Sequence, residues 1–281
     1  MGKNRNICTV KDRAGHTIRV TDNHRIMDLD DEANIVENYP SNVKYMLSPR
    51  GIDFPVINND ICLESYGRIR KDSPYLENHI AITPEFAELM GYYIADGCIL
   101  GKDGSTKTMC ITACEKVSHE HLVELATSVF GDKISVSKTF YNNSKTGTAV
   151  KDSRFYLGSR LSKMIIDKFG RVGDEKKIPK EILFSNPEIR QAFLRAYFVC
   201  DGRSGRKYSE SCSINKDLRD SLQLMIMSLS GYCYTSEREV ESPFNGKNVV
   251  LHQINISNKE SKRIGLKVSG DTSFEIPKYS L

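Results

Sequence analysis

The sequence predicts an α+β fold built from two pseudo-symmetric halves, each with the element order αββαββα, plus a small mainly β region at the N-terminus. Residues 83–97 and 186–202 are apolar segments that follow one pattern, and each closes on Asp-Gly. The segments after them also repeat one order of hairpin, helix, strand pair and helix. Duplication of a single unit explains this repetition better than chance. We expect two antiparallel sheets, each with helices on one face and the other face open.

Both apolar segments begin as helices should. Thr83 and Asn186 are capping residues, and a proline follows each at the first helical position. Small residues recur four apart along both segments. Residues four apart share a helix face, and small ones let two backbones approach closely. If these faces pack together, Asp96 and Asp201 emerge side by side at one end of the pair.

The two aspartates conflict with the helix ends that carry them. A carboxylate in the last turn faces the negative end of the helix dipole, which costs a few tenths to about 1 kcal/mol. A bound cation removes this conflict, and hard carboxylate oxygens are ligands that suit Mg²⁺. The glycines that follow, Gly97 and Gly202, predict a left-handed stop to each helix. Ordinary buried helices with Asp-Gly turns explain either segment alone, whereas two copies favour a shared metal site.

The two Asp-Gly helices carry a resemblance to a known family. Leu89–Gly97 and Leu194–Gly202 resemble the two signature helices of single-chain LAGLIDADG homing endonucleases, with glycine in one copy and alanine in the other at the third position. Lys176 begins a Lys-Lys-Ile-Pro sequence that resembles the family's K-x-I-P segment. The resemblance covers about residues 83–277. It implies αββαββα subdomains with saddle-shaped sheets that lie against DNA.

The resemblance also implies an activity. It is that of a site-specific endonuclease that hydrolyses both strands of a long asymmetric DNA target across the minor groove and leaves short 3′ overhangs. Asp96 and Asp201 match the family's metal-binding acids, and Lys176 matches its active-site lysine. The implied cofactor is Mg²⁺, with Mn²⁺ or Ca²⁺ as other occupants. The corresponding place in the second half holds Phe274 instead of lysine, so we expect one strand to be cut faster.

Two alternatives stay open. A non-cleaving nucleic-acid binder, either an RNA maturase or a DNA-binding regulator, fits the same scaffold, although both acids are present. Thr21 and His24 resemble the Thr-x-x-His block of intein splicing domains, which suggests an intein-associated protein. Position 1 is Met and the C-terminus does not end in His-Asn, so we expect a splicing-incompetent remnant. A plain β-hairpin explains the block equally well.

We expect three parts and double-stranded DNA as the partner. The parts are an N-terminal region over residues 1–82, a first subdomain over 83–180 and a second over 181–281. The net charge is +4, and residues 83–281 hold the excess, with 29 basic against 24 acidic side chains. A basic open face permits DNA binding, with accessory contacts from the N-terminal region. The candidate DNA-binding residues are Lys102, Lys107, Lys133, Lys138, Lys145, Lys151, Arg154, Arg203, Arg206, Lys207, Arg238 and Lys247.

The composition argues against several other classes of protein. No run of eighteen apolar residues exists, and the N-terminus lacks the apolar core of a signal peptide. The eight cysteines include no C-x-x-C pair and no histidines at zinc spacing. We therefore expect an intracellular, cytoplasmic monomer with reduced thiols.

Overall fold

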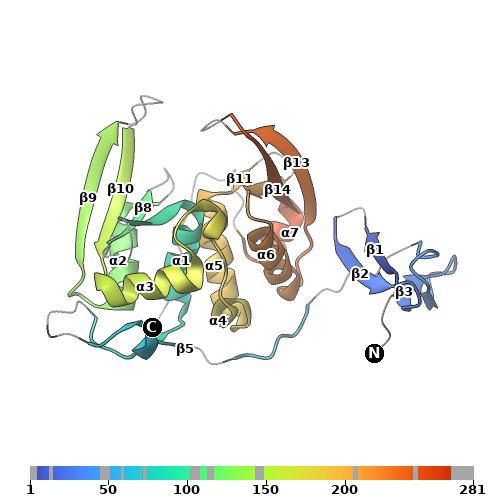
Figure 1. Cartoon of the computed structure of the whole chain (residues 1–281), viewed down its shortest axis with the longest axis horizontal. Helices are drawn as coiled ribbons and strands as arrows, with labels where there is room; N and C mark the ends of the chain where they lie inside the picture. Colours follow the sequence, from blue (N-terminus) through green and yellow to red (C-terminus); the bar gives the residue numbers. More distant parts are fainter. Residues whose placement is uncertain are drawn as a thin grey trace.

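The computed structural model describes residues 5–12, 15–44, 51–57, 60–69, 71, 75–101, 108–112, 117–142, 149–204, 208–242 and 246–266. Two halves flank a central pair of helices, and a small β region lies beyond the second half (Figure 1). The predicted fold class, α+β with two pseudo-symmetric halves and a mainly β N-terminal region, is confirmed.

The first half consists of a four-stranded sheet and three helices. Its helices are α1 (Pro84–Asp96), α2 (His119–Phe130) and α3 (Gly158–Phe169). Its strands are β7 (Gly97–Leu100), β8 (Thr108–Thr112), β9 (Ser135–Asn142) and β10 (Ala149–Tyr156), in the spatial order β7-β8-β10-β9. All neighbouring strands are antiparallel, which confirms the two predicted strand pairs.

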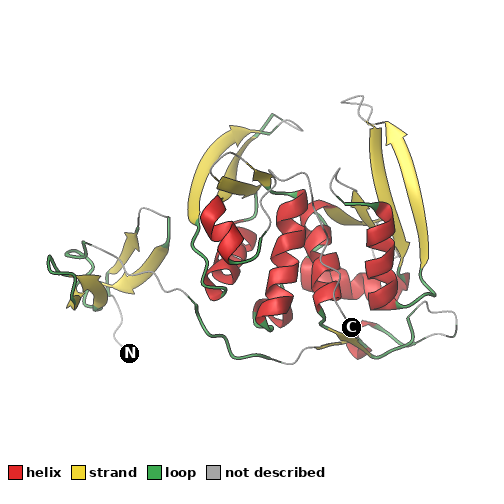
Figure 2. Cartoon of the chain, turned by 180° about the vertical axis from the view of Figure 1, so that it is seen from behind, coloured by secondary structure: helices red, strands yellow, loops and turns green. Residues whose placement is uncertain are grey.

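The second half repeats this topology. Its helices are α5 (Pro187–Cys200), α6 (Lys216–Ser228) and α7 (Asn258–Arg263). Its strands are β11 (Arg203–Ser204), β12 (Tyr208–Ser213), β13 (Tyr234–Glu241) and β14 (Asn248–Ser257), in the order β11-β12-β14-β13. The single turn η2 (Gly173–Glu175) and the short helix α4 (Lys180–Leu183) join the halves. Figure 2 shows the helices gathered together, with a strand pair rising on each side of them.

Helices α1, α2 and α6 begin at capping side chains, and Thr83 is one of the two caps that the sequence predicts. Thr83, Ser118 and Asn215 each accept a hydrogen bond from the backbone N–H three residues later. These bonds satisfy donors that the first turn of a helix leaves unpaired. The prediction for Asn186 is wrong, because no side-chain bond caps α5 there.

The predicted left-handed stops after the two central helices are also wrong. Gly97 has φ −103° and ψ 165°, because the chain passes from α1 directly into β7. Gly202 does not have a positive φ either. Both positions require glycine for another reason. A Cβ would lie 2.6 Å from the Tyr93 carbonyl oxygen at Gly97 and 2.1 Å from the Phe198 carbonyl oxygen at Gly202.

The core centres on the contact between α1 and α5, which is the most extensive contact between two helices in the described chain. A Cβ at Gly91 would lie 2.5 Å from the Phe193 carbonyl oxygen and 2.7 Å from the Ala196 Cβ. Ala192 and Ala196 are buried in the same interface. The predicted small-residue faces therefore do pack together, and one continuous hydrophobic core extends from them into both halves.

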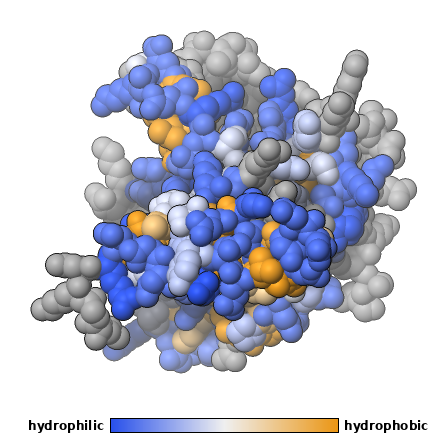
Figure 3. Space-filling model, turned by 90° about the vertical axis from the view of Figure 1, so that its right-hand side faces the viewer, coloured by the Kyte–Doolittle hydropathy of each residue, from blue (hydrophilic) through white to orange (hydrophobic). Residues whose placement is uncertain are grey.

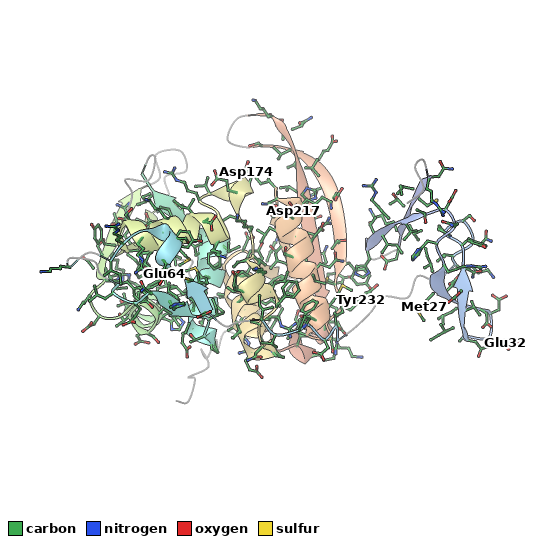
Figure 4. The ribbon with its side chains drawn as sticks, turned by 60° about the horizontal axis from the view of Figure 1, so that its bottom comes forward. Met27, Glu32, Glu64, Asp174, Asp217 and Tyr232 are labelled. Atoms are coloured by element: carbon green, nitrogen blue, oxygen red, sulfur yellow. The ribbon has the colours of Figure 1, made fainter. Side chains whose placement is uncertain are left out.

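The described residues between 5 and 44, the first part of the N-terminal region, form two small two-stranded sheets. They consist of β1 (Ile7–Lys11) with β2 (Thr17–Thr21), and β3 (Ile26–Leu29) with β4 (Ile35–Asn38). His16 and Tyr232 rings meet edge to face at 5.4 Å, and Figure 4 shows Tyr232 on the side of the second half that faces this region. Thr21 ends β2, and the backbone N–H of His24 in the turn that follows donates to the Thr21 carbonyl oxygen at 2.9 Å.

A strap over residues 51–57 connects this region to the first half. Gly51 N–H donates to the Met227 carbonyl oxygen at 2.9 Å, and Ile57 N–H donates to the Phe184 carbonyl oxygen at 3.3 Å. The strap leads to β5 (Asp60–Cys62), the turn η1 (Glu64–Tyr66) and β6 (His79–Ala81). Leu63, next to β5, is fully buried in the shared core. The predicted boundary at residue 82 stays a prediction, but residues 60–82 pack with the first half.

The side that carries the N-terminal region is mainly hydrophilic, with separate hydrophobic patches (Figure 3). Ile7, Met27 and Ile35 of this region are each more than half exposed, at 55%, 54% and 63%. Among the described residues, no helix combines the length and apolarity needed to cross a membrane. The described cysteines are all free thiols.

The close approach at Gly91 generates a stability prediction. Gly91→Ala should lower the free energy of unfolding by about 2 kcal/mol, because overpacking exceeds the gain of roughly 1 kcal/mol in helix propensity. Chemical denaturation measures this difference. Adding Ala196→Gly should restore only part of the loss, since the Phe193 carbonyl oxygen stays in place. A Gly91→Ala protein that is more stable than the wild type would contradict the described packing.

Candidate metal and nucleic-acid site

The two aspartates lie at the same end of the central helix pair. Asp96 is the last residue of α1, and Asp201 directly follows α5. The extensive packing of α1 against α5 brings these ends together. Burial raises the pKa of Asp96, and the negative charge of Asp201 raises it further. The helix packing thus brings together two acids that are remote in the sequence.

Asp96 keeps an exposed side at the end of α1. Protein packed around the rest of its carboxyl raises the pKa, the charge of Asp201 raises it further, and Lys176 opposes both. No side chain in the described ranges donates a hydrogen bond to Asp96. Among the described residues, Lys176 is the charge that favours the ionised form of Asp96, and a divalent cation would add to this compensation.

Asp201 is held by hydroxyl groups. Its Oδ2 accepts hydrogen bonds from the Tyr197 hydroxyl at 2.6 Å and from Ser211 Oγ at 3.1 Å. Burial raises the pKa of Asp201, and these two donors oppose the rise because they favour the ionised form. Both bonds end on Oδ2, which leaves Oδ1 to face another ligand.

Lys176 packs against the C-terminal part of α1, and only 4% of its surface is exposed. Its Nζ donates to the Tyr93 carbonyl oxygen at 2.7 Å and lies 3.4 Å from the centre of the Tyr93 ring. Burial lowers the pKa of Lys176 to about 7, although the charges of Cys98, Asp96 and Glu175 favour its protonated form. This lysine therefore changes charge near neutral pH.

Asn215 fixes the backbone on which Lys176 sits. Its Nδ2 donates to the Lys176 carbonyl oxygen at 2.7 Å and to the Asp174 carbonyl oxygen at 2.6 Å, while its Oδ1 caps α6. A residue of the second half thus positions the lysine of the first half.

The residues at this end suit a divalent cation whose ligands come partly from the protein and partly from a substrate. Within the described part of the chain, no group of three or more His, Cys, Asp or Glu side chains could hold a metal by itself. Mg²⁺ is commonly held by one or two carboxylates together with substrate phosphates and water. Asp96 and Asp201 supply such carboxylates, and a phosphate would complete the ligand set.

The open faces of the two sheets carry polar side chains. Along β10, Ser153 and Phe155 are buried, so Arg154 and Tyr156 lie on the opposite face because side chains alternate. Along β14, Ile254 and Ile256 are buried in the same way. By strand register, the open face of the second sheet then includes the positions of Ser236, Arg238, Gln253 and Asn255.

The predicted DNA-binding residues occupy different places. Arg203 follows Asp201 and is exposed in β11, and Arg238 is exposed on β13. Lys133 and Lys247 are exposed in the turns before β9 and β14. Lys138 lies on the helix-covered face, where its Nζ is 3.6 Å from Glu120 of α2. The side chain of Lys151 and the whole of five other candidates lie outside the described residues, namely Lys102, Lys107, Lys145, Arg206 and Lys207. DNA binding by any of these residues stays a prediction.

Three residues at this site were not predicted from the sequence: Tyr197, Ser211 and Asn215. Tyr197 lies four residues before Asp201, and this helical spacing was a readable signal for contact. Ser211 reaches Asp201 only through the register of the second sheet, which the sequence does not show. Asn215 was readable as a helix cap but not as a support for Lys176.

The element order and the paired acid-ended helices are those that the resemblance to LAGLIDADG homing endonucleases implies. Solved structures similar to the chain are homing endonucleases. A variant of I-DmoI in complex with its target DNA in the presence of magnesium is 16% identical, covers 68% of this chain and 98% of its own, and has a TM-score of 0.47. I-WcaI bound to its DNA recognition sequence is 14% identical, covers 64% of this chain and 78% of its own, and has a TM-score of 0.38.

No family model matches the chain. The curated proteins that are similar to it are much longer than this chain. An A-type ATP synthase subunit of Pyrococcus abyssi is 24% identical over 201 residues, which are 68% of this chain and 18% of that protein. The replication factor C small subunit of Methanocaldococcus jannaschii is 26% identical over 191 residues, 67% of this chain and 9% of that protein. A DNA polymerase of Thermococcus aggregans is 27% identical over 123 residues, 44% of this chain and 6% of that protein. The chain spans less than a fifth of the length of each.

The buried lysine generates a prediction about pH and stability. The pKa of Lys176 is about 7 in the folded chain and about 10.4 when unfolded, so between these values the unfolded chain binds more protons. Burying the charged lysine destabilises the wild type. This cost is present in full below pH 7 and disappears as the pH rises towards 10. Lys176→Met should therefore be more stable than wild type below pH 7, and its advantage should shrink by up to about 1.4 kcal/mol per pH unit above pH 7.

Chemical denaturation across this pH range measures the effect. Lys177→Met is the matched control, because Lys177 is exposed next in the chain. If the two variants show parallel profiles, the described burial of Lys176 is wrong.

Proposed function

We propose that the chain is a site-specific, divalent-metal-dependent DNA endonuclease of the LAGLIDADG homing type, which hydrolyses both strands across the minor groove. The observation that carries this proposal is the meeting of Asp96 and Asp201 at one end of the α1–α5 pair. Two carboxylates related by a pseudo-dyad suit two scissile phosphates on opposite strands. Both acids being present favours cleavage over the non-cleaving binder.

Each charged group has a distinct role in this proposal. Asp96 and Asp201 would hold the cation where the scissile phosphates bind. Mg²⁺, when bound, supplies charge stabilisation and lowers the pKa of a nucleophilic water. Lys176, whose pKa is about 7, stabilises negative charge that develops on the phosphate or accepts a proton near neutral pH. Because Lys176 interacts with Asp96, it serves the strand at that site.

The open sheet faces support double-stranded DNA as the substrate. Arginines fit phosphates and the edge of guanine, whereas hydroxyl and amide groups read other base edges. Arg154 lies on the first open face, and Arg238 lies on the second near the 3.1 Å hydrogen bond between Ser236 and Gln253. Two such faces on either side of the acids suit a long, asymmetric target.

The curated relatives support an intein-associated homing element. Their names describe a replication factor, a DNA polymerase and part of an ATP synthase, and these activities are unrelated. Each relative shares only a minor part of its length with this chain. One segment in proteins of unrelated activity is what an inserted, mobile element predicts. Thr21 and His24 of the N-terminal region fit this origin as remnants of a splicing block.

The first test is cleavage of a plasmid library that carries candidate target sites. The wild type should cut in the presence of Mg²⁺. Asp96→Asn and Asp201→Asn should each slow the cut of one strand at least about 100-fold, the order of loss for one electrostatic group at a reacting centre. The double variant should cut neither strand.

Glu85→Gln is the control for this test, since it makes the same acid-to-amide change at the opposite end of α1. It should cut at the wild-type rate. Cutting that persists in the double variant would remove Asp96 and Asp201 from the mechanism.

The second test concerns the open faces. Arg203→Gln and Arg238→Gln should each weaken binding to the target duplex, and each should reduce the slope of log affinity against log salt by about 0.9 if the arginine contacts a phosphate. Fluorescence anisotropy at several salt concentrations measures both quantities. Arg263→Gln is the control, because Arg263 pairs with Glu260 on α7. Affinities and slopes equal to wild type in both variants would place DNA elsewhere.

A further inference from the structure

The two acidic helix ends are supported differently. At the second, the Tyr197 hydroxyl and Ser211 Oγ both contact Asp201 Oδ2, and the two hydroxyl oxygens lie 2.9 Å from each other. Tyr197 is 1% exposed and Ser211 4%, so this support comes from the core. The carboxylate is thus fixed from the protein side.

The first half lacks this arrangement. Tyr92 lies four residues before Asp96, as Tyr197 does before Asp201, but the Tyr92 hydroxyl donates to Glu88 Oε1 at 3.0 Å. The strand position that corresponds to Ser211 holds Ile111, since Cys98 pairs with Cys110 as Arg203 pairs with Glu210. Neither counterpart donates a hydrogen bond to Asp96.

Counting protons shows how Asp201 is held. Tyr197 and Ser211 carry one hydroxyl proton each, and an ionised carboxylate only accepts hydrogen bonds. When Asp201 is ionised, the Tyr197 hydroxyl donates to Oδ2, and the single Ser211 proton is directed at Oδ2 or at the tyrosine oxygen 2.9 Å away. In either arrangement the protons of the pair support the same carboxylate oxygen.

A purely structural role does not account for this pair. Ile111 fills the matching place in the first half and is 1% exposed, so the fold accepts an apolar side chain there. The tyrosine hydroxyl likewise has another acceptor in the first half. The hydroxyl pair therefore serves what is particular to the second end, namely the carboxylate of Asp201.

We propose that Tyr197 and Ser211 are positioning residues for the second metal-binding carboxylate. They hold Oδ2 in the core and leave Oδ1 for the cation and the scissile phosphate, whereas Asp96 relies on Lys176. Partners of this kind orient a ligand, and their loss commonly costs 10- to 100-fold in metal affinity or activity. The inference rests on the proposed endonuclease function. It means that the carboxylate for one of the two cuts is held by a pair of hydroxyl groups, whereas the carboxylate for the other cut is not.

Strand-resolved cleavage tests the proposal, with the target recovered from the plasmid library and each strand end-labelled in turn. Tyr197→Phe and Ser211→Ala should each slow one strand roughly 10- to 100-fold, and it should be the strand that Asp201→Asn slows. The other strand should stay within about twofold of wild type. Tyr92→Phe is the matched control, and it should not change the ratio of the two strand rates.

Equal slowing of both strands, or no slowing, would overturn the proposal. Thermal unfolding of each variant shows whether it folds, and a strand ratio is a readout that general destabilisation does not move. If the wild type cuts both strands and the Tyr197→Phe protein cuts both at the same rates, only this inference is rejected and the proposed function stands.

A second measurement does not depend on cleavage. Mn²⁺ binding, followed by electron paramagnetic resonance in the Asp96→Asn protein, isolates the second carboxylate. Adding Tyr197→Phe should weaken Mn²⁺ binding about tenfold or more. Unchanged affinity overturns the inference. If the wild type neither cuts DNA with any divalent cation nor binds Mn²⁺, both the proposed function and this inference are rejected. If the wild type binds Mn²⁺ in a way that depends on Tyr197 but does not cut DNA, only the proposed function is rejected.

Discussion

The structure depends on the close approach of two helix backbones at Gly91. Because this residue has no side chain, the Phe193 carbonyl oxygen and the Ala196 Cβ occupy the space that a Cβ would need. The tight contact aligns α1 with α5, continues the core into both halves and brings Asp96 and Asp201 to one end. The electrostatic interaction between the two acids follows from this alignment.

Duplication provides two similar helix ends that differ in what compensates the charge of their aspartates. The first end has a buried lysine whose pKa is about 7, held by a backbone carbonyl and by Asn215 of the other half. The second end has two buried hydroxyls on its carboxylate. One end thus compensates negative charge with a titratable cation, and the other with neutral dipoles.

The sequence predicted those parts of the fold that local chemistry encodes. Apolar periodicity and capping residues such as Thr83 located the helices, the internal repeat singled out Asp96 and Asp201, and the family resemblance singled out Lys176. The sequence was misleading where a residue has more than one physical use, since Gly97 serves a close contact and not a left-handed turn. It gave no information where strand register decides, so neither the face of Lys138 nor the bond from Ser211 was predictable.

The strap over residues 51–57 separates two parts of the N-terminal region that pack against different halves of the molecule. Residues 60–82 are built into the first half, but His16 packs on Tyr232, which follows it by 216 residues. Ribosomes add about 5–20 residues per second, so the earliest strands wait roughly 10 to 40 seconds for their docking surface. The contact between His16 and Tyr232 therefore forms only after the strands of the second half have been synthesised.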